Sequence, residues 1–263
     1  MTRPIVFLTD YGLADEFVGI CHGVMAKIAP DSLVIDLTHA VARHEILHGA
    51  LVLARAVDYM PEDAVYVAVV DPGVGSDRRA IAVETSGGQL LVGPDNGLLS
   101  MTWEALGGAT RAFEITSEAV LLPTISRTFH GRDVFMPAAA HLAKGVPIDQ
   151  VGPSVPIGGL GVVPLPGPMV TPGKIGARVV GVDGFGNLQL NVSPDDLDHA
   201  GLRDRLNVAG RSVPRVSIFS DLHRNALGAI VDSQGYVALV VNKGSAADLL
   251  GLRPGATVVL EAE

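Results

Sequence analysis

Three polar side chains stand at the ends of strand-like runs in the first third of the chain. Asp10, His39 and Asp71 follow the apolar runs 5–8, 33–37 and 65–70. In an open parallel sheet, ligands bind beyond the carboxyl ends of the strands, so these three side chains are expected to share one site. Carboxylates and an imidazole in one site can hold hydroxyl groups or move protons. Taken singly, each carboxylate is also a common helix cap or turn former.

Two loop segments add charged groups to this set. The segment 71–79, DPGVGSDRR, contains glycines that permit close backbone approach to a ligand, together with Arg78 and Arg79, but it lacks the spacing and the lysine of a P-loop. The segment 128–133, TFHGRD, places His130 before a predicted helix start, where it can take part in proton handling. The alternatives are a plain Pro-Gly turn and a capping histidine.

A third segment, VDGFGN at 182–187, combines a carboxylate, an aromatic ring and an amide in Asp183, Phe185 and Asn187. These three groups can hold an amine and stack against a flat ring. The same letters are typical of a hairpin turn, which is the structural alternative. Ser233 and the segment NKGSAA, which begins at Asn242, are weak signals when taken alone.

The elements that must position these residues fall into two patterns. Residues 1–152 alternate strand-like runs with helical periodicity at 15–29 and 46–59, and two strands at 80–84 and 89–92 flank a turn. This order predicts an α/β domain with a mostly parallel sheet covered by helices on both faces.

The second half of the chain has a different composition. Residues 153–173 are rich in Pro and Gly, which predicts an extended linker along the surface. Residues 174–263 carry short strand patterns separated by turn residues, which predicts a small, mainly antiparallel β-barrel domain. The strands are expected at 177–182, 188–192, 213–219, 236–241 and 257–261.

Composition excludes several classes of function. The 263 residues carry a formal net charge of −9, so the basic surface of a nucleic-acid-binding protein is missing. No apolar run reaches the ~20 residues of a membrane span, and the N-terminus shows no signal-peptide pattern. The single cysteine, Cys21, excludes a disulfide framework or a Cys-rich zinc site. We therefore expect a cytoplasmic protein without membrane or nucleic-acid partners.

Six segments in this order and spacing give a resemblance that spans nearly the whole chain. TDYG, DPGVGSDRR, GPDNGLLS, TFHGRD, VDGFGN and NKGSAA together resemble the S-adenosylmethionine hydroxide adenosyltransferases (SAM hydrolases), relatives of the fluorinases and chlorinases. The resemblance implies an α/β domain joined to a β-barrel, and a homotrimer whose sites lie between the N-terminal domain of one subunit and the C-terminal domain of the next. It also implies hydrolysis of S-adenosylmethionine to adenosine and L-methionine, without metal or cofactor.

The resemblance also assigns roles to individual residues. The water-handling set that it implies is Asp71, Arg78 and His130. The substrate-binding set that it implies is Asp10 for the ribose hydroxyls, Asp183 for the methionine ammonium, Phe185 and Asn187 for the adenine, Ser233 for the methionine carboxylate, and a backbone contact to adenine around Asn242. The residue that finally accepts the water proton is left open.

Four positions depart from the fluorinases. Gln234 stands where they carry arginine and His44 where they carry tryptophan, which alters the carboxylate contact and the wall near the sugar. Asp71 replaces a tyrosine and Gly131 a serine, and a long fluorinase insertion after the third strand is missing. A carboxylate beside the attack position repels a halide and accepts a proton from water, so Asp71 favours hydroxide.

Two other functions fit the same residues. A metal-dependent phosphoesterase or amidohydrolase would use carboxylates and histidines on the same edge of the sheet, namely Asp10, Asp36, His39, Asp71 and His130. A non-catalytic adenosine- or S-adenosylmethionine-binding module would keep Asp10, Asp183 and Asn187 but would not need the water-handling set. The histidines inside helical patterns are interpreted as structural: His22, His48 and His141.

Overall fold

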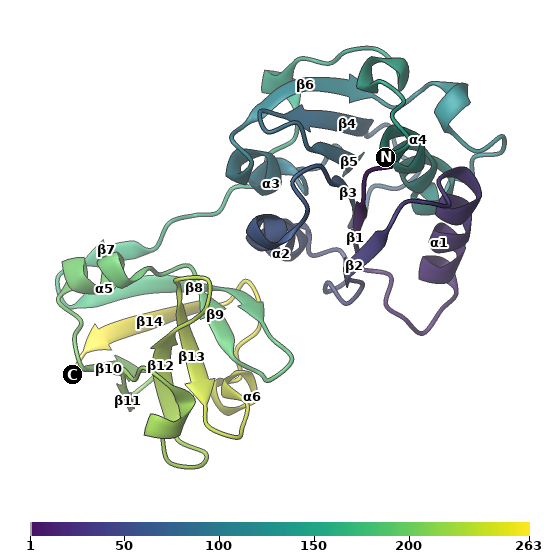
Figure 1. Ribbon diagram of the computed structural model, residues 1–263. Helices are drawn as coiled ribbons and strands as arrows, with labels where there is room; N and C mark the ends of the chain where they lie inside the picture. The colour runs from purple at the N-terminus through teal and green to yellow at the C-terminus, as the bar shows by residue number, and fades with distance from the viewer. Residues whose placement is uncertain (1) are drawn as a thin grey trace. The chain divides into compact units, whose positions relative to one another are not determined.

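The computed structural model describes residues 2–263, which form two compact units (Figure 1). The first unit ends at Pro164 and the second is Leu165–Glu263. The stretch 153–173, interpreted above as a linker, divides between them. Its first part pairs with the first unit, where Glu114 N donates to Pro153 O at 2.9 Å, and its last part contains a strand of the second unit. The backbone groups of this stretch are therefore partly satisfied by sheet pairing.

The first unit is built around one sheet with the strand order β2-β1-β3-β5-β4-β6. Strands β2, β1, β3 and β5 are mutually parallel, whereas β4 is antiparallel to β5 and β6. The strands are β1 (Ile5–Thr9), β2 (Val34–Thr38), β3 (Val65–Val69), β4 (Ala80–Thr85), β5 (Leu90–Pro94) and β6 (Ala109–Glu114). The mostly parallel sheet predicted from the sequence is confirmed.

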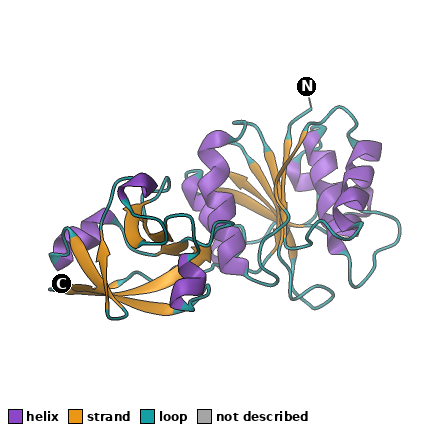
Figure 2. Ribbon diagram, turned by 90° about the horizontal axis from the view of Figure 1, so that it is seen from below, coloured by secondary structure: helices purple, strands orange, loops and turns teal. Residues whose placement is uncertain are grey.

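Helices cover both faces of this sheet, as Figure 2 shows with the strands seen between two helical layers. They are α1 (Phe17–Ile28), α2 (Ile46–Ala56), α3 (Ser100–Ala105) and α4 (Met136–Ala143). Alternate side chains of β1 enter opposite cores: Ile5 and Phe7 pack with α1 and α4, whereas Val6 and Leu8 pack with α2 and α3. This period of two buries every side chain of β1 and fixes which residues leave the strand at its carboxyl end.

Several element boundaries differ from the sequence prediction. The helix expected over 46–59 ends at Ala56 and continues as a 3₁₀ turn, η1 (Val57–Tyr59). The helix expected after His130 opens with a π-helical turn, η3 (Gly131–Phe135), before α4 begins. Further 3₁₀ turns are η2 (Glu118–Val120), η4 (Ile148–Gln150), η5 (Ile157–Gly159) and η6 (Phe219–Asp221). Tertiary contacts, rather than periodicity, decide such short elements.

The second unit is a barrel-like antiparallel sheet with the strand order β11-β10-β14-β8-β9-β13-β12, and β7 pairs with β8. A bridge between Arg215 and Ala229 joins the two ends of this order. The strands are β7 (Met169–Thr171), β8 (Lys174–Val182), β9 (Leu188–Leu190), β10 (Arg205–Val208), β11 (Arg211–Pro214), β12 (Leu227–Val231), β13 (Val237–Val241) and β14 (Thr257–Ala262). The short helices are α5 (Pro194–Ala200) and α6 (Ala246–Leu250).

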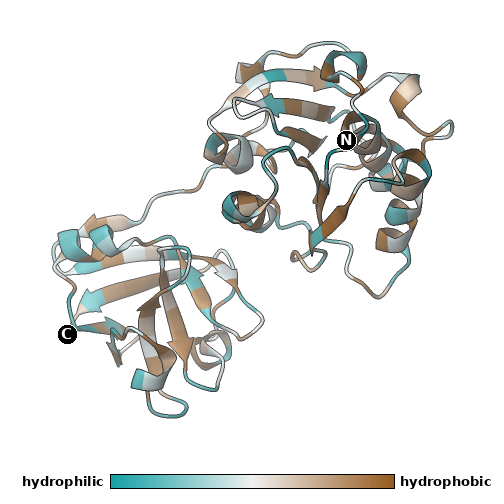
Figure 3. Cartoon of the chain, in the orientation of Figure 1, coloured by the Kyte–Doolittle hydropathy of each residue, from teal (hydrophilic) through white to brown (hydrophobic). Residues whose placement is uncertain are grey.

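The predicted barrel is confirmed, but the strand expected over 213–219 is wrong. Strand β11 ends at Pro214, and the missed strand β12 completes the barrel. Apolar residues line the strands of both units, shown in brown in Figure 3. In residues 2–263, no helix has the length and apolar character that a membrane crossing requires.

Candidate active site

The ends of β1 and β3 lie side by side in the sheet. The parallel register pairs Thr9 with Val69, so Asp10 and Asp71 leave neighbouring strands at the same edge. His39 lies at this edge too, because its Nδ1 is 2.9 Å from Thr9 Oγ1 and its backbone carbonyl accepts from Gly12 N at 2.7 Å. The sequence prediction that these strand ends meet is confirmed in geometry.

Asp71, Arg78 and His130 form one contiguous contact. Arg78 Nε donates to both carboxylate oxygens of Asp71 at 3.0 Å, and Arg78 Nη2 bonds Asp71 Oδ2. The same Nη2 lies 2.7 Å from His130 Nδ1. The side chains of Asp71 and Arg78 are only 5% and 11% exposed, so the pair is desolvated and held in one geometry.

The contact with Arg78 fixes the protonation state of His130. A guanidinium can only donate, so His130 Nδ1 must accept, and the neutral ring then carries its proton on Nε2. Burial, and secondly the positive charge of Arg78, lower the pKa of His130 below its ordinary value. His130 is therefore neutral near pH 7, with its proton on Nε2 and no free basic nitrogen.

The loop 71–79 is shaped by its own short hydrogen bonds. Ser76 Oγ donates to Gly73 O at 2.7 Å and accepts from Arg78 N at 3.3 Å. Gly75 adopts φ +78°, and a Cβ there would lie 2.4 Å from the carbonyl oxygen of Arg127. Only glycine therefore fits at position 75. Its small size lets the loop that carries Asp71 and Arg78 pack directly against the loop that carries His130.

Two buried residues support the arginine and the histidine from the interior. The guanidinium carbon of Arg78 lies 5.1 Å from the ring centre of Phe135, which is fully buried. Asp133, also fully buried, accepts from Ser126 N at 2.8 Å and from Arg132 Nε at 2.6 Å. Asp133 thereby anchors the loop before His130.

Tyr11, the third residue of TDYG, closes the other side of this region. Its ring packs edge-on against Phe17 and Phe129, with ring centres 5.9 and 5.8 Å apart. A Cβ at Gly131 would lie 2.1 Å from the Tyr11 hydroxyl oxygen. The Tyr11 ring can therefore occupy this position only because residue 131 has no side chain. Burial, followed by nearby negative groups, raises the pKa of Tyr11. Sequence reasoning did not single out Tyr11 as a site residue.

Asp10 is held by the loop that follows β2. Its Oδ2 accepts from His44 N at 2.9 Å, and His44 adopts φ +66°. Oδ1 of Asp10 retains its acceptor capacity for a ligand. His44, at the position where fluorinases carry tryptophan, is exposed.

In the second unit, the segment VDGFGN folds as a tight turn around Asp183. Asp183 Oδ1 accepts from Phe185 N and Asn187 N, both at 2.9 Å, and Oδ2 accepts from Asn187 Nδ2 at 2.8 Å. Since a carboxylate can only accept, the Asn187 amide must point its nitrogen at Asp183, which leaves its oxygen and one N–H for a ligand. Phe185 is 82% exposed at the tip of the turn.

A cavity of about 920 Å³ in the second unit gathers the predicted substrate-binding residues of that half. Those lining it are Asp183, Phe185, Asn187, Ser233 and Asn242. Sequence reasoning missed Ile218, Phe219 and Lys243, which also line it. The sequence does not show that the apolar side chains of Ile218 and Phe219 are exposed at this cavity. In the structure they are 56% and 43% exposed. A cavity of this size and lining accommodates a nucleoside.

Asn242 lines this cavity, but its polar groups form hydrogen bonds within the chain. Its side-chain amide donates to Leu222 O at 2.6 Å. Its backbone N–H donates to Ala226 O, and its carbonyl accepts from Asn225 N. These groups of Asn242 are therefore engaged within the chain.

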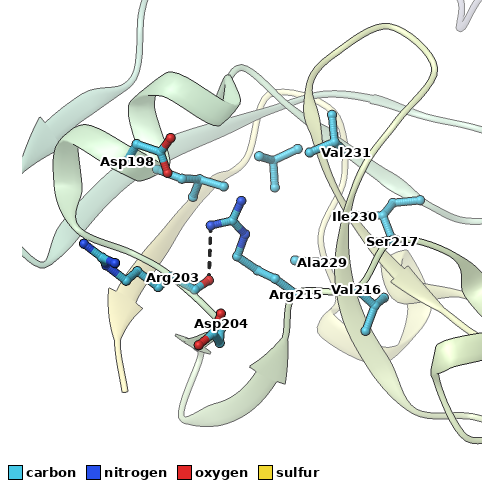
Figure 4. Close-up of a pocket in the computed structure, with 11 residues that line it drawn as sticks. Asp198, Arg203, Asp204, Arg215, Val216, Ser217, Ala229, Ile230 and Val231 are labelled. Carbon is cyan, nitrogen blue, oxygen red and sulfur yellow. Dashed lines mark hydrogen bonds between the residues drawn. The ribbon is translucent and has the colours of Figure 1, made fainter.

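A second cavity in this unit, about 800 Å³, borders the first and shares Ser217, Ile230 and Val231 with it; it lies between α5, the loop before β10, and β12 (Figure 4). Two acidic and two basic side chains line it: Asp198, Arg203, Asp204 and Arg215. Arg215 points into it, and Nη1 donates to the carbonyls of Leu202 and Arg203 at 2.9 and 3.2 Å. The two acidic and two basic side chains balance in formal charge.

The alternative of a metal-dependent hydrolase finds little support at Asp71 and His130. Both side chains contact Arg78, so a guanidinium already occupies the position between them. Asp36 and His39 contact each other and His22, as described further below. The five residues proposed as one metal centre are therefore divided between different partners.

Comparisons with known proteins agree with this geometry. Residues 5–152 match the SAM hydroxide adenosyltransferase N-terminal domain, and residues 177–259 match the C-terminal domain of the same family. An "(R)-S-adenosyl-L-methionine hydrolase" of Salinispora arenicola is 51% identical over 97% of this chain and 96% of its own length. A fluorinase of Actinoplanes sp. is 27% identical over 98% of this chain and 97% of its own length.

Among solved structures, an uncharacterized conserved protein from Thermotoga maritima superposes with a TM-score of 0.87 and is 34% identical, covering 97% of this chain and 99% of its own. The fold and the site thus define an adenosyl-transferring α/β and β-barrel protein. The chain belongs to the SAM hydroxide adenosyltransferase family. The resemblance inferred from the six segments is confirmed, as is the more distant relationship to the fluorinases.

Proposed function

We propose that this protein hydrolyses S-adenosylmethionine to adenosine and L-methionine. The observation that carries the proposal is the Asp71–Arg78–His130 contact, because a non-catalytic binding module has no need for a jointly oriented acid, arginine and imidazole. Near-full-length identity of 51% to a protein named as an (R)-S-adenosyl-L-methionine hydrolase supports the same substrate.

The chemistry requires few groups. The oxygen of a water attacks the ribose C5′, the C5′–S bond breaks, and its electron pair returns to sulfur to give neutral methionine. The positive sulfonium is already a good leaving group, so no acid is needed at sulfur. The protein must place the water in line and accept its proton.

We assign these tasks to three side chains. Asp71 is the proton acceptor, since its carboxylate has acceptor capacity beyond the bonds from Arg78. His130 presents an Nε2 proton that can donate to the water oxygen and fix its lone pair. Arg78 orients both partners through one planar fork.

Binding of the substrate falls to residues outside this set. Asp10 accepts from the ribose hydroxyls with its remaining oxygen. Asp183 accepts from the methionine ammonium, since three N–H donors leave part of its carboxylate open. The oxygen and N–H of Asn187 read the adenine edge, the ring of Phe185 stacks on the base, and Ser233 contacts the methionine carboxylate.

Water is preferred over halide as the nucleophile. The ion pair with Arg78 holds a carboxylate at the position where fluorinases carry tyrosine, and a carboxylate repels an approaching anion. The reaction requires no metal or cofactor, since sulfonium departure supplies the driving force.

We infer further that the working assembly is a homotrimer in which each site is shared between subunits, as the family resemblance implies. In support, the water-handling side chains belong to the first unit and the adenine-binding ones to the second. A cytoplasmic location fits the one cysteine, Cys21, which is buried and forms no disulfide.

The direct test is incubation of purified protein with S-adenosylmethionine, followed by chromatography. Equal amounts of adenosine and methionine, formed at the same rate with and without chelator, support the proposal. Loss of activity on chelation, restored by zinc or manganese, would favour the metal-dependent hydrolase. Tight binding of adenosine without turnover would favour the binding module.

A further inference from the structure

A cluster of two histidines and one carboxylate lies at the sheet edge next to the proposed site. His22 comes from α1, Asp36 from the edge strand β2, and His39 from the loop after β2. His22 Nε2 and His39 Nε2 lie 2.9 and 3.1 Å from the same oxygen, Asp36 Oδ1. One ligand atom from each residue lies within 4.8 Å of the others.

Hydrogen bonding within the cluster does not account for His39. Its side chain is 3% exposed, and its Nε2 makes no well-aligned hydrogen bond within residues 2–263, although it lies 3.1 Å from Asp36 Oδ1. His22 Nε2, by contrast, forms a hydrogen bond with the same oxygen at 2.9 Å. The relation of His39 to Asp36 is the one that two ligands of one metal ion have, because each lone pair then points at the ion rather than at the neighbouring ligand. Tetrahedral zinc with bonds of about 2.0–2.1 Å places its ligand atoms roughly 3.3 Å apart.

The surroundings of the His39 ring fit a metal-binding imidazole. His39 Nδ1 lies 2.9 Å from the hydroxyl of Thr9, which is fully buried. When Nδ1 donates to this hydroxyl, the lone pair of Nε2 is free for a metal, the usual outer-shell arrangement of a ligating histidine. Phe7, paired in register with Asp36, packs against both rings, with centres 6.2 Å from His22 and 4.8 Å from His39.

We propose that His22, Asp36 and His39 bind one divalent first-row transition-metal ion, such as Zn²⁺, with water in the remaining position. Two imidazoles and a carboxylate suit this class of ion. The side chains of His22 and Asp36 are 36% and 40% exposed, which gives the ion a path from solvent. The site uses none of the water-handling or substrate-binding residues, and its role is to join α1 to the end of β2.

The test uses full-length protein stripped with EDTA and titrated with ZnCl₂ in competition with a chromophoric chelator. We expect one equivalent of Zn²⁺ per chain. His22→Gln and Asp36→Asn should each weaken binding by at least about 10-fold, because each removes one of three protein ligands. His199→Gln, in α5 of the other unit, is the matched control and should bind as the wild type does.

Co²⁺ provides a second readout that is independent of activity. The wild type should give visible d–d absorption with Co²⁺ that His22→Gln loses. His39 is buried, so its substitution can unfold the chain, whereas the two exposed ligands avoid that ambiguity. Zn²⁺ binding that is absent in the wild type, or unchanged in both variants, would overturn the proposal. Neither outcome depends on whether S-adenosylmethionine is hydrolysed.

Discussion

The guanidinium of Arg78 donates to Nδ1 of His130 across 2.7 Å while it also holds Asp71 by Nε and Nη2. This relationship bears on which group acts as the base in the mechanism we propose. Because the basic nitrogen of His130 is occupied, we expect Asp71 rather than His130 to accept the proton released by water.

Acid pH should inactivate the enzyme through His130. Burial and Arg78 lower the pKa of His130, so the neutral ring persists to below the ordinary value of about 6.5. Protonation there would turn Nδ1 into a donor that faces the guanidinium. We therefore expect kcat to fall as pH drops through this lowered pKa. His141→Gln is the control and should keep the same acid limb, since His141 lies in α4 outside the contact.

The free energy of unfolding should also decrease as the pH falls. Because the pKa of the folded state lies below that of the unfolded chain, the unfolded state binds the proton first as pH falls. The free energy of unfolding should therefore decline below about pH 6.5 and level off below the lowered pKa. His48 and His141, whose pKa values are lowered mainly by burial, contribute in the same sense. NMR titration that places the pKa of His130 at or above 6.5 would contradict the lowered pKa on which this prediction rests.

Asp71→Asn should reduce turnover by about 10²–10⁴-fold, the usual contribution of a general base. The substitution preserves the size of the side chain and removes its charge. Affinity for S-adenosylmethionine, measured by calorimetry, should change little because other residues hold the ribose, adenine and methionine. Asp77→Asn in the same loop is the matched control, with an exposed carboxylate. Near-normal turnover would remove Asp71 from the mechanism, and loss of binding would make it a sulfonium anchor.

Gly131→Ser should destabilise the protein by about 1–3 kcal/mol, the usual cost of overpacking. The new Cβ would lie 2.1 Å from the Tyr11 hydroxyl, and the Tyr11 ring is confined by Phe17 and Phe129. Tyr11→Phe in the same chain should recover part of the loss. Gly23→Ser is the control, because a Cβ at Gly23 meets nothing within 4 Å. Thermal unfolding in which Gly131→Ser matches Gly23→Ser would show that Tyr11 moves freely.

Mixing two inactive variants tests whether subunits share a site. Asp71→Asn disables the first unit, and Asn187→Ala disables the second. If one site draws these units from different subunits of a trimer, random co-assembly should restore about a quarter of the sites. The measurement is turnover after co-expression, with each variant alone as baseline. Activity no higher than the baseline would place both units of a site in one chain.

The hydrophobic pattern of the sequence predicted the sheet and helices of the first unit, because the burial of apolar side chains determines these elements. The apolar strand β1 and the helical period of α1 determine the parallel sheet, and the predicted strand ends bring Asp10 and Asp71 to one edge. The barrel strands were less predictable: β12 has a Gly and an exposed valine, Val231, so its alternation is weak, and its pairing with β13 decides it.

The hydrophobic periodicity of the sequence could not predict contacts between loops. The meeting of Gly75 with Arg127, the anchoring role of Asp133 and the position of Tyr11 against Gly131 all join segments that are distant in sequence. His22 was interpreted as structural because it lies in a helical pattern. Its partner Asp36 becomes visible only once α1 packs against the sheet edge.

The origin of the oxygen in the product tests the central claim most directly. S-adenosylmethionine should be incubated with the enzyme in H₂¹⁸O, and the adenosine analysed by mass spectrometry. We predict one ¹⁸O atom in each adenosine, at the 5′-hydroxyl, with unlabelled methionine. Adenosine without ¹⁸O at the 5′ position, or no adenosine at all, would contradict attack by water on C5′.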